Sequence, residues 1–424
     1  ITLASTTNLA VGTVGAATGI NSAGGVDLTS GGSIAVDEVI AGTGAVSLTA
    51  TNLTVSEAIT TGGGDFTASA DQILITAQGG GNNGSVDSDG GAISLTSSGN
   101  IELRQTSILS GGPAAGGSIT IVAGDGLDVL NSTIDSSTGT GGALGVGGGV
   151  NLQGSSAVTV GAGDITLDGG LLDVIIDNST LNFDANNGLI SAIRDVQIIN
   201  GSSVNSQNGF NIIITADSDG LQNADGRGTA VGGVLIDAGS SVVSDGTLTI
   251  QGTERVGTPA NSIDIAGGLS ANGYIIITGA TNTSGGVNLA AITSSGGSVT
   301  AISGGSLSAN GAINGGGTVF LEGAGDVALA QDVVSGDAIT VSSTAGAISQ
   351  SGGTLTATSG GGQSVLLSAA TGIGDSSPIQ VLTGTLAADN STSGALQIAS
   401  PGDVALGTLS STQGSMPSAS GLQN

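Results

Sequence analysis

The chain contains no cysteine, histidine, lysine or tryptophan among its 424 residues. Without cysteine, no disulfide bond contributes to stability and a thiol redox role is excluded. Without histidine and cysteine, the usual nucleophile–base pairs of hydrolases cannot be assembled. These absences indicate that the protein is not an enzyme.

Positive charge is almost absent as well, because 4 arginines face 32 acidic residues and the net charge is −28 at pH 7. A nucleic-acid-binding protein needs cations to displace counterions from phosphates, so that class is excluded. There is no run of roughly 18 apolar residues, and the sequence therefore predicts no membrane insertion. Arg104 and Arg194 each lie within three positions of an acidic residue, which predicts surface ion pairs.

Aromatic residues make up 1% of the chain and charged residues 8%, whereas there are 80 glycines and only 5 prolines. Ordinary globular chains contain roughly 7% glycine and about 25% charged residues. The composition is therefore typical of a repetitive polymer. Since the mean hydropathy is +0.36, the chain does not have the low hydrophobicity of a disordered protein.

Short apolar–polar–apolar fragments recur about every twenty residues. Apolar residues at this spacing include Val26, Val46 and Phe66 near the start, and Val299, Val319 and Ile339 further along. A three-residue strand cannot bury an apolar face by itself, but stacked coils about 4.8 Å apart pair every strand with the coils on either side. The sequence therefore predicts an all-β fold, a single elongated parallel β-helix with three short strands per coil of about 20 residues, which we expect to be right-handed.

Insertions and irregular segments interrupt this period. Between Ile93 and Ile119 the step is 26 residues, mainly because of the glycine-rich segment at 111–117, which we expect in a loop outside the stack. The β-helix is predicted over 1–410, with a less regular region at 161–280 that forms either wider coils or one sheet extending beyond the helix wall. The segment 411–424 loses the pattern and is interpreted as a tail or linker. Since the chain starts at Ile1 without methionine, we expect it to be part of a longer polypeptide.

Two loops contain the sequence Asp-Ser-Asp-Gly. The first supplies Asp87 and Asp89, and the second supplies Asp217 and Asp219, followed by Asp225. Closely spaced carboxylates in a glycine-rich loop can bind Ca²⁺ through oxygen ligands. The EF-hand pattern is incomplete at both places, so solvated turns without a metal are the alternative interpretation.

The few aromatic residues bear on glycan binding, which commonly uses exposed aromatic side chains. Phe66 and Phe320 lie in predicted strands and are expected in the core, whereas Tyr274 is a candidate for exposure. If the protein binds extracellular glycans, we expect the contacts at the loops 77–91, 109–118 and 215–233.

Several segments resemble a known family. They are SGGSIAVDEV (30–39), SSGNIELRQTSI (97–108), GIGDSSPIQVLTGTLAA (372–388) and GALQIASPGDVALG (394–407). These segments resemble filamentous haemagglutinin repeats, the β-helical shafts of large bacterial exoproteins. The resemblance implies export through a dedicated outer-membrane pore, an extracellular or cell-surface location, and a role in adhesion, matrix or biofilm.

Three functions follow as hypotheses. The first is the shaft or repeating subunit of an extracellular fibre, whose partners are identical subunits stacked end to end or further β-helix of the same chain. Unpaired edge strands invite such pairing, and a head-to-tail contact that does not close makes filaments. The second is an adhesin shaft that binds a glycan or surface through its loops, and the third is a β-helical polysaccharide lyase or hydrolase.

Overall fold

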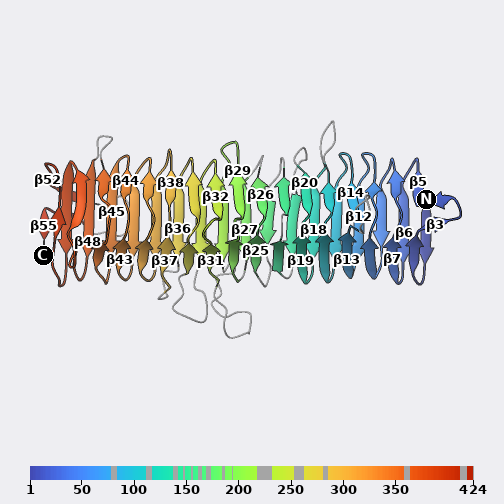
Figure 1. Ribbon diagram of the computed structural model, residues 1–424, viewed down its shortest axis with the longest axis horizontal. Coiled ribbons are helices and arrows are strands. Elements are labelled where there is room, and N and C mark those ends of the chain that lie inside the picture. The colour runs from blue at the N-terminus through green and yellow to red at the C-terminus, as the bar shows by residue number, and fades with distance from the viewer. Residues whose placement is uncertain are drawn as a thin grey trace. The chain divides into compact units, whose positions relative to one another are not determined.

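The computed structural model describes residues 1–77, 84–110, 117–136, 142–146, 149–153, 156–160, 165–168, 173–183, 187–192, 194–216, 232–252, 262–279, 285–357, 363–410 and 418–423. In these residues the regular elements are β-strands and there is no α-helix, so none offers a helical membrane span. The chain divides into two compact units, Ile1–Phe210 and Asn211–Asn424. Each unit is a parallel β-solenoid built from three sheets (Figure 1).

In the unit Ile1–Phe210, each coil adds one strand to each sheet. The first sheet contains β1 (Thr2–Ser5), β6 (Val26–Ser30), β9 (Val46–Thr49), β12 (Phe66–Ala70), β15 (Ile93–Ser97), β18 (Ile119–Ala123), β21 (Gly142–Val146), β24 (Ile165–Asp168) and β27 (Gly188–Ala192). The second contains β2 (Leu9–Val11), β7 (Ser33–Val36), β10 (Asn52–Val55), β13 (Gln72–Thr76), β16 (Asn100–Arg104), β19 (Gly126–Leu130), β22 (Gly149–Gln153), β25 (Val174–Asp177) and β28 (Val196–Ile199). The third contains β5 (Ile20–Ser22), β8 (Ile40–Gly42), β11 (Ile59–Thr60), β14 (Ser85–Asp87), β17 (Ser107–Leu109), β20 (Thr133–Ser136), β23 (Ala157–Val160), β26 (Thr180–Phe183) and β29 (Ser203–Ser206). A small antiparallel hairpin, β3 (Thr13–Val14) and β4 (Ala17–Thr18), lies between β2 and β5.

The unit Asn211–Asn424 repeats this arrangement. Its first sheet contains β30 (Ile212–Ala216), β33 (Leu248–Gly252), β36 (Ile275–Gly279), β39 (Val299–Ser303), β42 (Val319–Gly323), β45 (Ala338–Ser343), β48 (Ser364–Ala369), β50 (Thr385–Asn390), β52 (Ala405–Leu406) and β55 (Leu422–Gln423). The second contains β31 (Val234–Ile236), β34 (Ile263–Ile265), β37 (Val287–Leu289), β40 (Leu307–Ala309), β43 (Val327–Leu329) and β46 (Ile348–Gln350). The third contains β32 (Ser241–Ser244), β35 (Gly268–Ala271), β38 (Ile292–Ser294), β41 (Ile313–Gly315), β44 (Val333–Ser335), β47 (Leu355–Ala357), β49 (Ile379–Thr383) and β51 (Ile398–Ala399). The antiparallel pair β53 (Thr408–Ser410) and β54 (Ser418–Ser420) follows.

The register confirms the predicted parallel stacking. Phe66 pairs in register with Val46 on one side and with Ile93 on the other. Its side chain and theirs are buried, while the residues between the buried positions of each strand face outward. Alternate side chains of a strand point to opposite faces, so each strand contributes its apolar positions to a core that runs from coil to coil.

The insertion at 111–117 begins and ends at one corner of the coil. The Oγ atom of Ser110 donates a hydrogen bond to the carbonyl oxygen of Gly117 at 2.7 Å, and Gly117 N donates to Ser110 O at 3.0 Å. In the preceding coil, Ser88 Oγ makes the same bond to Gly91 O at 2.5 Å with no insertion. The added residues therefore leave the register of the strands unchanged, as predicted.

Glycine at this corner is required by close stacking. A Cβ atom on Gly117 would lie 2.0 Å from the carbonyl oxygen of Gly91, and one on Gly91 would lie 2.1 Å from that of Gly64. Contacts this short are not found in proteins, so only glycine allows successive corners to approach to the strand spacing. The high glycine content thus has a structural cause at these positions.

Strand lengths in 161–280 match those elsewhere in the chain. Strands β27, β30 and β36 have 5 residues each, and β31 and β34 have 3. The irregular sequence of this region is found in the connections, because 17 residues (217–233) separate β30 from β31, whereas 3 residues (324–326) separate β42 from β43. Of the segment 411–424, residues 418–423 form β54 and β55.

A row of buried hydroxyl groups connects coils at the corner between the second and third sheets. Ser132 Oγ accepts a hydrogen bond from Thr106 N at 3.2 Å, and Ser156 Oγ accepts one from Ser132 N at 3.2 Å. Ser156 Oγ also donates to the carbonyl oxygen of Val129 at 3.1 Å. Each hydroxyl therefore satisfies a buried N–H group of the preceding coil, which would otherwise lack a partner.

We expect Ser132→Ala to lower the free energy of unfolding by about 1–3 kcal/mol, because it leaves the buried Thr106 N–H group unpaired. Urea denaturation followed by circular dichroism measures the change. Thr133→Ala, at the next position, removes a hydroxyl that faces outward and is the control, with an expected change within about 0.5 kcal/mol. Equal effects of the two substitutions would show that the buried hydroxyl contributes nothing specific.

Apolar residues also lie on the outer face of the first sheet in the unit Asn211–Asn424. Phe320 is buried, with 4% of its surface exposed, but it lies on the opposite face of β42 from Val319 and Leu321. Its burial was predicted, and its position outside the coil was not. Two and three coils further along this sheet, Leu366 in β48 and Ala387 in β50 are buried on the same outer face and pack with Leu409 and Ala419 of the β53–β54 pair.

Glu322 lies two residues beyond Phe320 on this outer face, and burial raises the pKa of its carboxyl group above the ordinary value of 4.5. The folded protein therefore binds more protons than the unfolded chain between the two pKa values, so stability falls as the pH rises through the folded pKa. We expect Glu322→Gln to raise the melting temperature at pH 7, with a gain that disappears below pH 4.5. Thermal melts of both proteins across this pH range, with Asp27→Asn as the exposed control, test the expectation, and a gain that persists at low pH would contradict it.

Candidate functional site

The predicted calcium ligands Asp87 and Asp89 lie at the corner after β14. Asp87 Oδ1 accepts a hydrogen bond from Asp89 N at 3.0 Å, and Asp89 has a positive φ of 47°. The first carboxylate thus stabilises a tight turn, which is the usual role of aspartate there. In the part of the chain that the structure describes, no three acidic side chains form a metal-ligand cluster. Asp217, Asp219 and Asp225 lie outside the described residues, so calcium binding stays a prediction.

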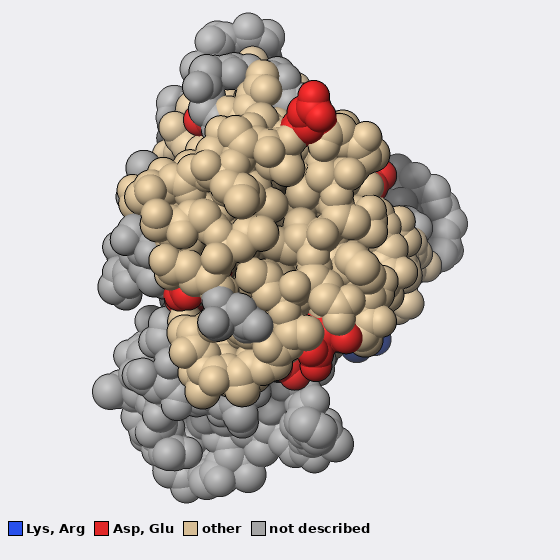
Figure 2. Space-filling model, turned by 90° about the vertical axis from the view of Figure 1, so that its left-hand side faces the viewer, with Lys and Arg blue, Asp and Glu red and all other residues tan. Residues whose placement is uncertain are grey.

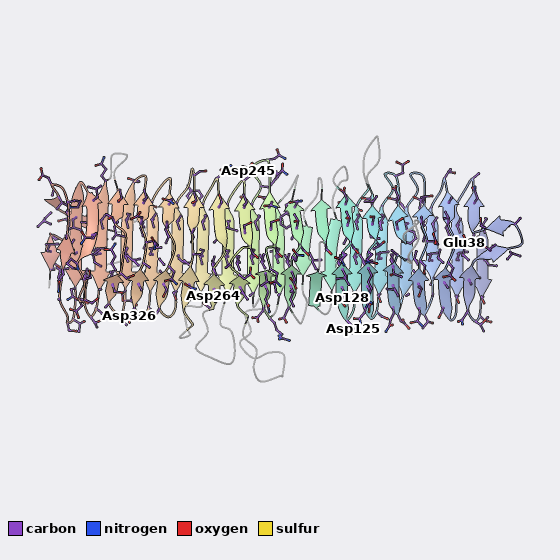
Figure 3. The ribbon with its side chains drawn as sticks, in the orientation of Figure 1. Glu38, Asp125, Asp128, Asp245, Asp264 and Asp326 are labelled. Atoms are coloured by element: carbon purple, nitrogen blue, oxygen red, sulfur yellow. The ribbon has the colours of Figure 1, made fainter. Side chains whose placement is uncertain are left out.

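Aspartate carboxylates at other corners accept hydrogen bonds from the main chain of the next coil. Asp326 Oδ1 accepts from Ala347 N at 2.9 Å, and Asp332 Oδ1 accepts from Thr354 N at 2.9 Å. Asp125, Asp245 and Asp326 lie at the upper and lower margins of the ribbon (Figure 3). Part of the acidic composition therefore serves coil-to-coil hydrogen bonding.

Arg104 forms the ion pair with a nearby acidic residue that the sequence predicts, whereas Arg194 pairs with an aspartate of the preceding coil. Arg104 Nη2 lies 2.6 Å from Glu102 Oε2 on the same strand, and Arg194 Nε lies 3.4 Å from Asp173 Oδ1. Both pairs are partly exposed, so each contributes little to stability. Arg227 and Arg255 lie outside the described residues.

The aromatic residues do not gather on the surface. Phe66 and Phe183 are buried among inward-facing residues, which confirms the prediction for Phe66. Tyr274 is exposed, as the sequence suggested, at the residue before β36. The described residues therefore contain no stacked aromatic surface of the kind used by many glycan-binding proteins.

The first coil of the unit Ile1–Phe210 presents an open edge. Strands β1, β2 and β5 each pair with one neighbour, β6, β7 and β8. No strand among the described residues pairs with their other side. The side chains of Ile1 and Leu3 are 58% and 48% exposed at this edge.

The unit Asn211–Asn424 presents a second open edge at β52 and β55. Both strands pair with β50, and in the described part of the chain neither has a partner on its other side. Leu406 and Leu422 are 57% and 47% exposed there. Figure 2 shows this end of the unit, where the surface is largely uncharged and acidic side chains lie at its margin.

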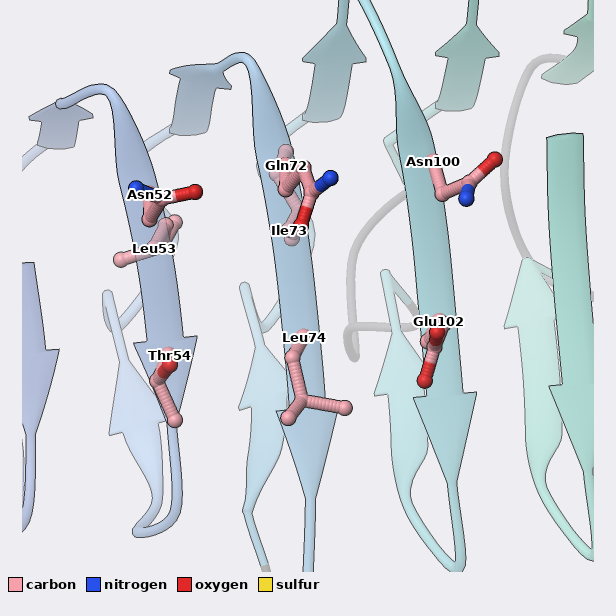
Figure 4. Close-up of a pocket in the computed structure, with 8 residues that line it drawn as sticks. All are labelled: Asn52, Leu53, Thr54, Gln72, Ile73, Leu74, Asn100 and Glu102. Atoms are coloured by element: carbon pink, nitrogen blue, oxygen red, sulfur yellow. The ribbon is translucent and has the colours of Figure 1, made fainter. Parts of the chain in front are cut away.

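A shallow pocket of about 180 Å³ lies on the outer face of the second sheet of the unit Ile1–Phe210. It crosses β10, β13 and β16, and its outward-facing residues are Asn52, Thr54, Gln72, Leu74, Asn100 and Glu102 (Figure 4). The inward apolar positions, from which the fold is predicted, give no sign of this pocket. Aligning the outward positions of NLTV, QILI and NIEL would have shown three amide side chains at equivalent positions.

No protein-family model, curated protein or solved structure matches the chain.

Proposed function

We propose that the chain is a structural β-solenoid segment of an extracellular bacterial fibre, at the cell surface or in a matrix, in which the edge of one segment pairs with the edge of another. The two open edges carry this proposal. At each edge, short parallel strands have no partner on one side among the residues that the structure describes, and leucine or isoleucine side chains are exposed. A further parallel coil, from a second copy or from the same polypeptide, would satisfy the main chain and cover these side chains.

Charge supports association through the edges rather than through the sides. The end at β52 and β55 is largely uncharged (Figure 2), while the chain as a whole carries −28. Side-by-side contact brings like charges together and is disfavoured, whereas edge-to-edge contact continues the strand ladder. The segments that resemble filamentous haemagglutinin repeats favour the same function, secretion and surface location.

The experiment compares assembly of the native chain with that of edge variants. Leu3→Lys and Leu406→Lys each place a charge at one open edge, which blocks strand pairing there. Leu382→Lys, on the outer side of β49, is the control for added charge. Sedimentation velocity and negative-stain electron microscopy over a range of concentrations should show filaments of the native chain and the control, and a shift to single molecules for the edge variants. Single native molecules at every concentration would contradict assembly through these edges.

A further inference from the structure

The pocket on the second sheet of the unit Ile1–Phe210 contains a row of amide groups. Asn52 and Gln72 are partners in the strand register, and Asn100 holds the same position in β16 (Figure 4). All three side chains are exposed and make no hydrogen bond to any described residue. Some amides elsewhere on the outer surface are bonded between coils, as Asn205 Nδ2 is to Asn182 Oδ1 at 3.0 Å. The three pocket amides therefore keep their donors and acceptors available to a ligand.

A second row lies beside the amides and forms the floor of the pocket. Thr54, Leu74 and Glu102 are register partners on successive coils, and all three are half-buried. Leu74 supplies an apolar surface between a hydroxyl group and a carboxylate. The Glu102 carboxylate is held by its ion pair with Arg104 at 2.6 Å. In the coils on either side of these three, the position of the amide is held by a small residue, Ser33 in one coil and Gly126 in the other. The polar groove is therefore limited to three coils.

The spacing and chemistry of the groove match one class of ligand. Equivalent groups repeat at the strand spacing of about 4.8 Å, which is close to the length of one sugar unit in an extended glycan. Sugar hydroxyl groups both donate and accept hydrogen bonds, as amides do, and the C–H face of a sugar ring fits the apolar surface of Leu74. The net charge of −28 disfavours an anionic polymer. We propose that this groove binds an uncharged polysaccharide lying across β10, β13 and β16, with one sugar unit at each coil.

This binding function differs from assembly through the edges, because the groove lies on the side of the coils. It also differs from the loop contacts expected from the sequence, since the amide and floor side chains come from strands. Neither filament formation nor any loop is required for it, so the two proposals can fail separately.

Affinity electrophoresis in native gels tests the proposal, with soluble mixed-linkage β-glucan and galactomannan as uncharged probes and alginate as the anionic probe. We expect at least one uncharged probe to retard the native chain, and alginate to have no such effect. The triple variant N52A/Q72A/N100A should bind that probe about tenfold more weakly or worse, because it loses three hydrogen-bonding groups. T49A/T67A/T96A is the matched control, since it removes exposed side chains from the first sheet of the same region and should be retarded like the native chain.

Circular dichroism of each variant verifies that the fold is retained. Absence of retardation of the native chain by both uncharged probes, or equal retardation of the native chain and the amide variant, would overturn the proposal.

Discussion

Leu95→Asp is expected to unfold the coils around β15, whereas Thr96→Asp at the next position leaves them folded. Leu95 is fully buried and pairs in register with Ala68 and Ile121, which face the same core. Removal of such a leucine costs about 2–5 kcal/mol, and burial of a carboxylate adds several more, since no partner is present. Thr96 is exposed, so a charge there should change stability by about 0.5 kcal/mol or less.

Urea denaturation followed by circular dichroism measures both variants. Since each coil contacts only its neighbours, we expect Leu95→Asp to lose part of the β-signal at low urea and the rest near the native midpoint. Two variants with the same single midpoint would contradict the assignment of these residues to opposite faces of the sheet.

Deletion of one complete coil is expected to leave a folded protein, while deletion of half a coil is not. Val299 pairs in register with Val319, so removal of residues 300–319 joins Val299 directly to Phe320 and preserves the sequence of strands. The neighbouring pairs Leu307–Val327 and Ile313–Val333 have the same separation of twenty residues. The shortened chain loses one coil, and the remaining coils keep the same strand pairing with their neighbours.

Removal of residues 300–309 is the matched comparison, because it deletes half as many residues from the same place. Asn310 then follows Val299 directly. The first-sheet strand therefore stops after Val299, and the corner that normally follows the second-sheet strand takes the place of its remaining residues. We expect the full-coil deletion to be soluble, with a melting temperature within a few degrees of the native value, and the half-coil deletion to be aggregated or partly unfolded. Equal behaviour of the two chains would mean that the repeat is not the structural unit.

The sequence predicts those parts of the fold that depend on the alternation of apolar and polar residues within a strand. Val26, Val46 and Phe66 stand at the same place in three successive fragments, and each must bury an apolar side chain against the next. That the insertion at 111–117 leaves the strands in register could be predicted, because the strands before and after it keep their pattern. Both features follow from which residues of a three-residue strand are apolar.

The outer surface could not be predicted in this way. Phe320 has neighbours of the same apolar kind on both sides, so its sequence gives no sign that it lies outside the coil. Nor does the Asp-Ser-Asp-Gly motif reveal that Asp87 accepts the hydrogen bond of Asp89 N. The pocket of Asn52, Gln72 and Asn100 depends on outward residues of three coils, which carry no apolar signal and become neighbours only through the register.

The most direct test of the stacked-coil fold uses cysteine pairs, since the chain has no cysteine of its own. Thr67 and Ser94 are register partners on the outer face of β12 and β15, and Thr120 follows one coil further on, in β18. Adjacent parallel strands are about 4.8 Å apart, within the Cα–Cα range of a disulfide bond, whereas two coils span about twice that distance. Oxidation followed by non-reducing electrophoresis and mass spectrometry should show a cross-link in T67C/S94C and none in T67C/T120C. Failure of the first pair to cross-link, or equal cross-linking of both pairs, would contradict the parallel coil-on-coil register.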